Sequence, residues 1–256
     1  MSVLEVRALS KAFGGVRAVS EVSFAVGEGE FLAMIGPNGA GKTTCFNIVN
    51  GQLAPDSGEI LFAGKNIAGL EPRAIWRLGV GRTFQVAATF GSMTVAENVQ
   101  MALISHGGDI HRLWKPAAAL HRERALRLLA QVGMVEAADR PSRELAYGDV
   151  KRVELAIALA NEPRLLLMDE PTAGMAARER HGLIALVKRL VVERRISVLF
   201  TEHSMDVVFA FADRVIVLAR GRLIADGDAA AIRDNPQVRE VYFGTGKTFA
   251  AHGATP

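Results

Sequence analysis

The sequence Phe31-Leu-Ala-Met-Ile-Gly36-Pro-Asn-Gly39-Ala-Gly41-Lys42-Thr43-Thr44 joins a five-residue apolar run to a glycine-rich loop. The loop satisfies the pattern G-x-x-x-x-G-K-[ST], in which the glycines let successive backbone N–H groups converge on phosphate oxygens. The apolar run predicts a buried strand, and residues 43–50 predict a helix whose N-terminus adds the positive end of its dipole. Together the three parts predict a nucleotide-phosphate site and disfavour a glycine-rich turn with a solvated lysine.

The residues of this loop have separate expected tasks. We expect Lys42 to reach the outer phosphates of the nucleotide, and the hydroxyl of Thr43 to bind Mg²⁺, which prefers oxygen ligands. The loop as a whole is expected to bind ATP. The ATP-binding residues predicted in this way are Gly36, Pro37, Asn38, Gly39, Ala40, Gly41, Lys42, Thr43 and Thr44.

The composition is typical of a folded protein without a membrane span. With 256 residues the chain can hold one large domain or two closely associated subdomains, and 50% hydrophobic residues exclude a disordered protein. The mean hydropathy is +0.19, yet no run of about 18 uncharged apolar residues occurs. The N-terminus lacks the layout of a signal peptide and the single Cys45 cannot form an internal disulfide, so we expect a cytosolic location and an inert, packed Cys45.

The chain has more basic than acidic residues, which raises the question of nucleic-acid binding. The net charge is +3 and the pI is about 9.2. The basic pairs Lys151-Arg152, Arg194-Arg195 and Arg220/Arg222 are scattered among acids, whereas a nucleic-acid footprint gathers on one element with aromatic residues nearby. We therefore expect no nucleic-acid partner.

The first part of the chain predicts three short strands before any long helix, over residues 3–8, 21–26 and 31–35. Gly14-Gly15 marks the break between the first two. Phe13 lies on this break and is either a core phenylalanine or an exposed aromatic that stacks on a nucleotide base, a contact worth about 1–3 kcal/mol for nucleic-acid bases. The sequence leaves both alternatives open.

The middle of the chain changes from strand to helix periodicity. It predicts a strand over 59–62, a strand over 79–85 that ends in Gln85, and a helical insertion from about 94 to 160. Residues 105–111 contain two histidines and an aspartate, but they complete no set of metal ligands with a defined spacing. We expect a solvated loop there.

The run Leu165-Leu-Leu-Met-Asp169-Glu170-Pro171 is a second apolar strand, and it ends in two acids. In an open parallel sheet ligands bind at the C-terminal edge of the strands, so these acids are expected beside the phosphate loop. Asp169 would hold Mg²⁺, directly or through water, and Glu170 would position or deprotonate the attacking water. The alternative is a strand that only leads into a helix cap, which the pairing with the phosphate loop disfavours.

The strand predicted over 196–201 repeats this layout, because it ends in Glu202-His203. At the same edge, His203 is expected to donate a hydrogen bond to the γ-phosphate or to the attacking water. The other segments of this part are predicted to be an amphipathic helix over 177–195, a hairpin of strands 214–219 and 223–225, and a short helical tail over 228–242.

Five motifs occur in this order along nearly the whole chain: Gly36 to Thr44, Gln85, Leu145 to Asp149, Leu165 to Glu170, and His203. Their combination resembles the ATP-binding subunits of ABC transporters. The resemblance implies an α/β fold, with a P-loop NTPase core around a mostly parallel sheet, an N-terminal antiparallel β subdomain and an inserted α-helical subdomain. The implied division is a discontinuous nucleotide-binding core at 1–86 and 161–230, a helical subdomain at 87–160 and a C-terminal tail at 231–256.

The resemblance also implies roles for single residues. Phe13 is similar to the adenine-stacking aromatic of the family, Glu170 to the catalytic base and His203 to the switch histidine, with Lys42 completing the catalytic set. Gln85 is similar to the glutamine that senses Mg²⁺ and the membrane partner. The implied metal ligands are Thr43, Gln85 and Asp169. The family works as a head-to-tail dimer, in which each ATP lies between the phosphate loop of one subunit and the signature segment of the other.

The segment Leu145-Ala146-Tyr147-Gly148-Asp149 stands where the family has its signature, commonly Leu-Ser-Gly-Gly-Gln. Ala146 lacks a hydroxyl that in the family contacts the γ-phosphate, and a hydrogen bond to a charged group is worth roughly 1.5–3 kcal/mol. The N–H of Gly148 and the helix that starts near Val150 remain, so we expect weakened anion binding. Ala176 also stands where many relatives have an acid, and we therefore expect unequal catalysis at the two composite sites.

Several features together resemble one of the two ATPases of branched-chain amino acid importers. They are the Leu-Ala-Tyr-Gly signature, the motif Arg82-Thr-Phe-Gln85, a helical insertion that is long for the family, and a tail ending Val241-Tyr-Phe-Gly244. In that subfamily two different ATPases pair on the cytoplasmic face of the inner membrane, beneath two transmembrane permease subunits. An extracytoplasmic solute-binding protein delivers the solute. The resemblance thus implies a peripheral ATPase that drives amino-acid uptake.

Other functions within and outside transport are weaker alternatives. Importers of urea, short amides or other amino acids have related ATPases, because the solute is bound elsewhere in the complex. Soluble ABC ATPases that act on ribosomes or DNA typically carry two nucleotide modules or a long coiled-coil insertion, and this chain has neither. A lipopolysaccharide-extraction ATPase would be expected to keep an intact Ser-Gly-Gly signature.

Overall fold

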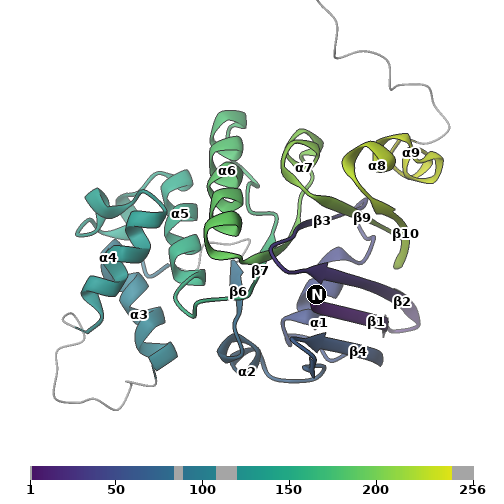
Figure 1. The fold of residues 1–256 in the computed structure, drawn as a ribbon, viewed down its shortest axis with the longest axis horizontal. Coiled ribbons are helices and arrows are strands. Elements are labelled where there is room, and N and C mark those ends of the chain that lie inside the picture. Colours follow the sequence, from purple (N-terminus) through teal and green to yellow (C-terminus); the bar gives the residue numbers. More distant parts are fainter. Residues whose placement is uncertain (1, 84–88, 108–119, 244–256) are drawn as a thin grey trace, which may run out of the picture.

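A computed structural model describes residues 2–83, 89–107 and 120–243 (Figure 1). Within these residues the strands form two sheets. The smaller sheet is antiparallel with the strand order β2-β1-β4-β5, from β1 (Ser2–Phe13), β2 (Val16–Gly27), β4 (Ser57–Phe62) and β5 (Lys65–Asn66). The larger sheet has the order β10-β9-β3-β8-β7-β6, from β3 (Phe31–Ile35), β6 (Val80–Thr83), β7 (Leu165–Asp169), β8 (Ser197–Thr201), β9 (Arg214–Ala219) and β10 (Arg222–Gly227).

The larger sheet is parallel except for its edge strand β10, which pairs with β9 in the antiparallel sense. Every residue of β3, β7 and β8 is buried, because elements cover both faces of the sheet. Successive side chains of β3 enter two different cores, as the pleat of a strand requires. Phe31, Ala33 and Ile35 pack with the helices, whereas Leu32 and Met34 pack with the antiparallel sheet and α1 (Lys42–Val49).

The remaining helices are arranged around this sandwich. On the left of Figure 1 lies a group made of α3 (Val95–Gly107), α4 (Arg122–Gln131) and α5 (Tyr147–Ala158). At the opposite end lie α8 (Ala229–Asp234) and α9 (Pro236–Phe243). The other helices are α2 (Pro72–Arg77), α6 (Ala177–Arg194) and α7 (Met205–Phe211). In the parts of the chain that are described, none of these helices has the length and apolar character needed to cross a membrane.

The α/β class and the mostly parallel sheet predicted from the sequence are confirmed. The strand predicted over 31–35 has the predicted bounds, whereas β1 and β2 run twelve residues each and meet at Gly14-Gly15 as one long hairpin. The prediction of a loop over 105–111 was wrong in its first part, because α3 continues to Gly107, and the rest lies outside the described residues. The predicted helical tail is two helices, since Pro236 starts the second.

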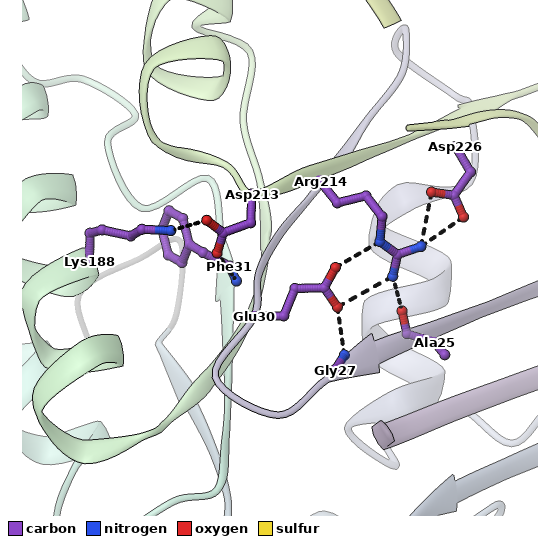
Figure 2. A network of polar contacts seen from close by, with 8 residues as sticks. All are labelled: Ala25, Gly27, Glu30, Phe31, Lys188, Asp213, Arg214 and Asp226. Atoms are coloured by element: carbon purple, nitrogen blue, oxygen red, sulfur yellow. Dashed lines mark hydrogen bonds and ion pairs between the residues drawn. The ribbon is translucent and has the colours of Figure 1, made fainter. Parts of the chain in front are cut away.

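A polar network centred on Arg214 joins the two sheets at the start of β9 (Figure 2). Its Nε donates to Glu30 Oε1 at 2.7 Å, and one terminal nitrogen donates to both carboxylate oxygens of Asp226 at 2.9 and 2.8 Å. Its other terminal nitrogen donates to the carbonyl of Ala25 in β2. The hydrogen bond to Glu30 raises the pKa of the Arg214 guanidinium, and the charge of Asp226 adds to this. The two sheets are therefore linked by charge as well as by the apolar core.

Candidate functional site

The phosphate loop connects the end of β3 to the first turn of α1, and two of its glycines are required by close backbone contacts. Gly36 and Gly41 have φ values of 156° and 103°. A Cβ atom on Gly36 would lie 2.2 Å from the carbonyl oxygen of Leu218, and one on Gly41 would lie 2.4 Å from that of Ala18. Only glycine fits both positions. The loop is thereby held between β9 of the larger sheet and β2 of the smaller one.

Lys42 is buried inside the curve of this loop. Its ammonium group donates to the carbonyl oxygen of Gly36 at 2.6 Å and to that of Pro37 at 3.1 Å. Burial lowers the pKa of Lys42, while the negative charges of Glu170 and Asp169 act in the opposite direction. A cation with two neutral acceptors is well placed to exchange them for phosphate oxygens.

The two acids predicted at the end of β7 lie next to Thr201, the last residue of β8. Asp169 pairs with Thr201 in the strand register, and the Thr201 hydroxyl donates to Asp169 Oδ1 at 2.7 Å. The same hydroxyl oxygen accepts a hydrogen bond from the backbone N–H of Glu170 at 2.9 Å. Arg82, in β6, lies 3.9 Å from the other oxygen of Asp169, and burial lowers the pKa of its guanidinium. Asp169 is thus oriented on both sides.

Glu170 and His203 face each other across two neighbouring loops. His203 Nε2 lies 2.7 Å from Glu170 Oε1. Glu170 has a φ of 48°, a left-handed conformation that is unusual for a residue other than glycine. Strained backbone conformations are common at functional sites, where the surrounding structure holds the residue in place.

Lys42, Glu170 and His203 line one cavity of about 450 Å³, a size typical of small-molecule sites, whereas Asp169 is not among its lining residues. Its wall combines the phosphate loop with both catalytic candidates and with the aromatic residue from the β1–β2 hairpin. The lining residues are Phe13, Ala18, Asn38, Gly39, Ala40, Gly41, Lys42, Thr43, Thr44, Glu170 and His203. The side chain of Phe13 is 47% exposed, so the alternative of a core phenylalanine was wrong. The structure thus brings together residues that lie far apart in the sequence.

The donor set of the site fits a magnesium nucleotide. The lysine, the loop N–H groups and the helix N-terminus suit phosphate oxygens. Thr43 and Asp169 offer the oxygen ligands that Mg²⁺ prefers. Gln85, the third predicted metal ligand, lies outside the described residues.

The predicted signature segment stands apart from this cavity, since none of its residues lines it. Ala146 is the N-cap of α5, and no side-chain hydrogen bond caps that helix. Tyr147 is 45% exposed, and the ammonium group of Lys151 lies 5.5 Å from its ring centroid. Leu145, Gly148 and Asp149 complete the segment, which therefore lies at the exposed start of α5.

Three further residues bear on the sequence predictions: Thr201 and Arg82, which contact Asp169, and the buried Cys45. Sequence patterns assigned no contact with Asp169 to Thr201 or Arg82. Thr201 is a polar residue at the end of a buried strand, which is the same signal that identified Asp169. Cys45 is fully buried in α1, and burial raises the pKa of its thiol to about 12. A thiol with so high a pKa is unreactive, which agrees with the predicted packing role.

The chain is similar to proteins of one transport family. A family described as "ABC transporter" matches residues 19–173, and one described as "Branched-chain amino acid ATP-binding cassette transporter" matches residues 222–248. The high-affinity branched-chain amino acid transport ATP-binding protein BraF of Pseudomonas aeruginosa is 40% identical over 94% of this chain and 98% of its own. LivG of Escherichia coli, with the same description, is 37% identical over the same shares.

The fold has solved counterparts in the same family. The crystal structure of the ADP conformation of an ATP-binding cassette of an ABC transporter superposes with a TM-score of 0.86. It is 32% identical in sequence, and the match covers 95% of this chain and 99% of that one.

Proposed function

The chain belongs to the ABC transporter family of ATP-binding subunits, and we propose that it drives the uptake of branched-chain amino acids through a membrane complex. It is an ATPase of the ABC type and binds nucleotide. The amino-acid substrate is supported by the similarity to BraF and LivG over nearly the whole length of each chain. The observation that carries the ATPase assignment is the cavity shared by Lys42, Glu170 and His203.

In the proposed reaction, water attacks the γ-phosphate in line with the leaving group. Lys42 and the N–H groups of the loop would stabilise charge on the transferred phosphoryl oxygens. Thr43 and Asp169 would hold Mg²⁺, which neutralises charge between the outer phosphates. Glu170 would orient or deprotonate the water, and His203, 2.7 Å away, would fix the Glu170 carboxylate and reach the γ-phosphate. Phe13 would stack on the adenine.

The separation of the signature segment from the cavity supports a site completed by a second chain. Leu145 to Asp149 would face the ATP held by a partner ATPase, because they line no part of the cavity of their own chain. We propose a heterodimer of two different ATPases beneath two permease subunits, peripheral on the cytoplasmic face of the membrane, with an extracytoplasmic protein delivering the solute. The proposed division of this chain is a core at 1–86 and 161–230, a helical subdomain at 87–160 and a tail at 231–256.

The catalytic assignment is tested by replacing Glu170 with Gln in the assembled complex. Loss of a positioned general base typically costs 10²–10⁴-fold, so we expect ATP turnover to fall by at least about 100-fold while ATP affinity is retained. Glu193→Gln is a matched control, because Glu193 forms an exposed pair with Arg189 at 3.8 Å. Turnover that survives Glu170→Gln would refute the assignment.

We propose that the two composite sites hydrolyse ATP at unequal rates. The test is to replace the catalytic base of the partner ATPase in the same way as Glu170. The weak signature of this chain faces the partner's ATP, so the partner's own base should matter less than Glu170. Equal loss of turnover from the two changes would refute the inequality.

The transported solute is tested by uptake rather than by hydrolysis. The complex, reconstituted in vesicles with its solute-binding protein, is expected to accumulate radiolabelled leucine on addition of ATP. Urea and short amides serve as competing solutes. Uptake of urea without uptake of leucine would replace the proposed substrate and leave the ATPase assignment intact.

A further inference from the structure

The structure contains a second carboxylate beside the catalytic candidates, that of Glu202. It follows the last residue of β8 and precedes His203. Its residue is only 3% exposed, and no ion pair to it occurs among the residues that the structure describes. A buried carboxylate without a cation is costly unless hydrogen bonds satisfy its oxygens.

Four donors meet this carboxylate from two loops. Oε1 accepts from the backbone N–H of Thr172 at 3.2 Å and from the Thr172 hydroxyl. Oε2 accepts from the backbone N–H groups of His203 at 2.9 Å and Ser204 at 3.1 Å. One oxygen thus serves the loop after β7, and the other serves the loop after β8.

These contacts close a ring around the catalytic candidates. Thr172 lies two residues after Glu170, and Glu202 lies one residue before His203. The ring is completed by the 2.7 Å contact between His203 Nε2 and Glu170 Oε1. Glu202 therefore fixes the backbones that carry both side chains.

We propose that Glu202 is a positioning residue that sets the geometry of Glu170 and His203 for ATP hydrolysis. This inference rests on the proposed function of those two residues. Glu202 does not itself act on water, because it is buried and both of its oxygens are occupied by donors. A displacement of about 1 Å in a reacting group can cost about 100-fold in rate, so a loose anchor is expected to slow the reaction.

The main test compares three single variants in the assembled complex. Glu202→Gln places an amide group where an acceptor is needed, and Thr172→Val removes the hydroxyl donor. We expect both to lower kcat at least about 10-fold while the affinity for ATP changes less than about 3-fold, and Thr172→Ser to restore turnover close to that of the unmodified chain. Glu193→Gln serves again as the exposed control.

A double variant separates positioning from general stability. Because Glu202 is proposed to act partly through His203, adding Glu202→Gln to His203→Ala should lower kcat by a smaller factor than Glu202→Gln lowers it in the unmodified chain. A purely structural role predicts a loss of similar size in both backgrounds. Unchanged kcat in Glu202→Gln, or full additivity with His203→Ala, would overturn the proposal.

Amide hydrogen exchange provides a readout that does not depend on turnover. In Glu202→Gln, the amides of Thr172, His203 and Ser204 are expected to exchange at least about 10-fold faster than in the unmodified chain, while those of β3 stay protected. Unchanged exchange at these three amides would overturn the anchoring role. If the unmodified complex fails to hydrolyse ATP, the proposed function fails instead, whatever the exchange result.

Discussion

At the scale of single residues, Lys42 is a buried cation whose hydrogen-bond acceptors are neutral. The ammonium group is buried and donates to the carbonyls of Gly36 and Pro37, which carry no full negative charge. Burial therefore outweighs the nearby acids, and the pKa of Lys42 lies below its usual value. The phosphates of a bound nucleotide would place negative charge beside this ammonium group. Binding is thus expected to raise this pKa.

The first prediction follows from the sign of that change. Between the lowered pKa of the free chain and the higher pKa of the complex, nucleotide binding takes up a proton. ATP affinity should therefore be constant well below the lowered pKa of Lys42 and fall as the pH rises above it. Calorimetry with a non-hydrolysable ATP analogue, in two buffers of different ionisation enthalpy, measures both affinity and proton uptake.

Lys42→Arg is the control for this pH dependence. A guanidinium stays protonated throughout the range, so this variant should bind more weakly but with a flat pH profile. A profile equally flat in the unmodified chain would contradict the prediction.

At the scale of elements, the start of α5 has a missing helix cap. Its N-cap residue is Ala146, which offers no side-chain acceptor to the free N–H groups of the first turn. Asp149 lies in that turn and favours the positive end of the helix dipole. The alanine that replaces the usual serine of the signature therefore also leaves the first turn of α5 without a side-chain cap.

The second prediction is that Ala146→Ser stabilises the isolated chain. A serine N-cap is worth about 1 kcal/mol, which corresponds to a rise in melting temperature of about 2–4 °C for a chain of this size. Ala130→Ser in α4 is the control, because a serine within a helix costs a few tenths of a kcal/mol. In the assembled complex the added hydroxyl should also raise hydrolysis of the partner's ATP. A lower melting temperature for Ala146→Ser would contradict the capping argument.

The elements that sequence patterns predicted well are those that carry their own signal. β3 and β7 are uninterrupted apolar runs with a polar residue or glycine at the end, and their predicted positions agree with the structure. The helices α2 and α7 escaped prediction because they are six and seven residues long, too short to establish a helical period. A pattern of so few residues does not distinguish a helix from a turn.

Some residues of the candidate site could be predicted from the sequence and others could not. Lys42 and the acid pair of β7 could be predicted, because a motif or a strand end marks each of them. The contacts of Glu202 with Thr172 could not, since they depend on two loops that are distant in the sequence and adjacent only in the fold. The exposure of Phe13 also had to come from the structure, because the hairpin that carries it is longer than its apolar pattern suggested.

At the scale of the whole molecule, the cavity is built where the two sheets meet. Phe13 comes from the antiparallel sheet, whereas the phosphate loop follows β3 of the parallel one. The turn after β9 connects them, because Gly221 N–H donates to Ala40 O at 3.0 Å and Gly221 O accepts from Ser20 N–H at 2.7 Å. Arg214 makes the corresponding link at the other end of β9 (Figure 2). The position of the antiparallel sheet therefore affects the site.

The last prediction concerns this link and uses Arg214→Met, which keeps the apolar stem and removes the charge. The change would leave Glu30, whose side chain is only 17% exposed, without its cation. Breaking a buried pair costs about 3–5 kcal/mol, and the 28% exposure of Arg214 reduces this to about 2 kcal/mol, or about 4–8 °C in melting temperature. Arg164→Met is the control, because its contact with Glu28 is 3.5 Å long and both side chains are more than half exposed. If the two variants melt at the same temperature, the network does not hold the sheets together. The position of Phe13 in the cavity then depends on the other contacts between the sheets, such as the apolar core and the Gly221 turn.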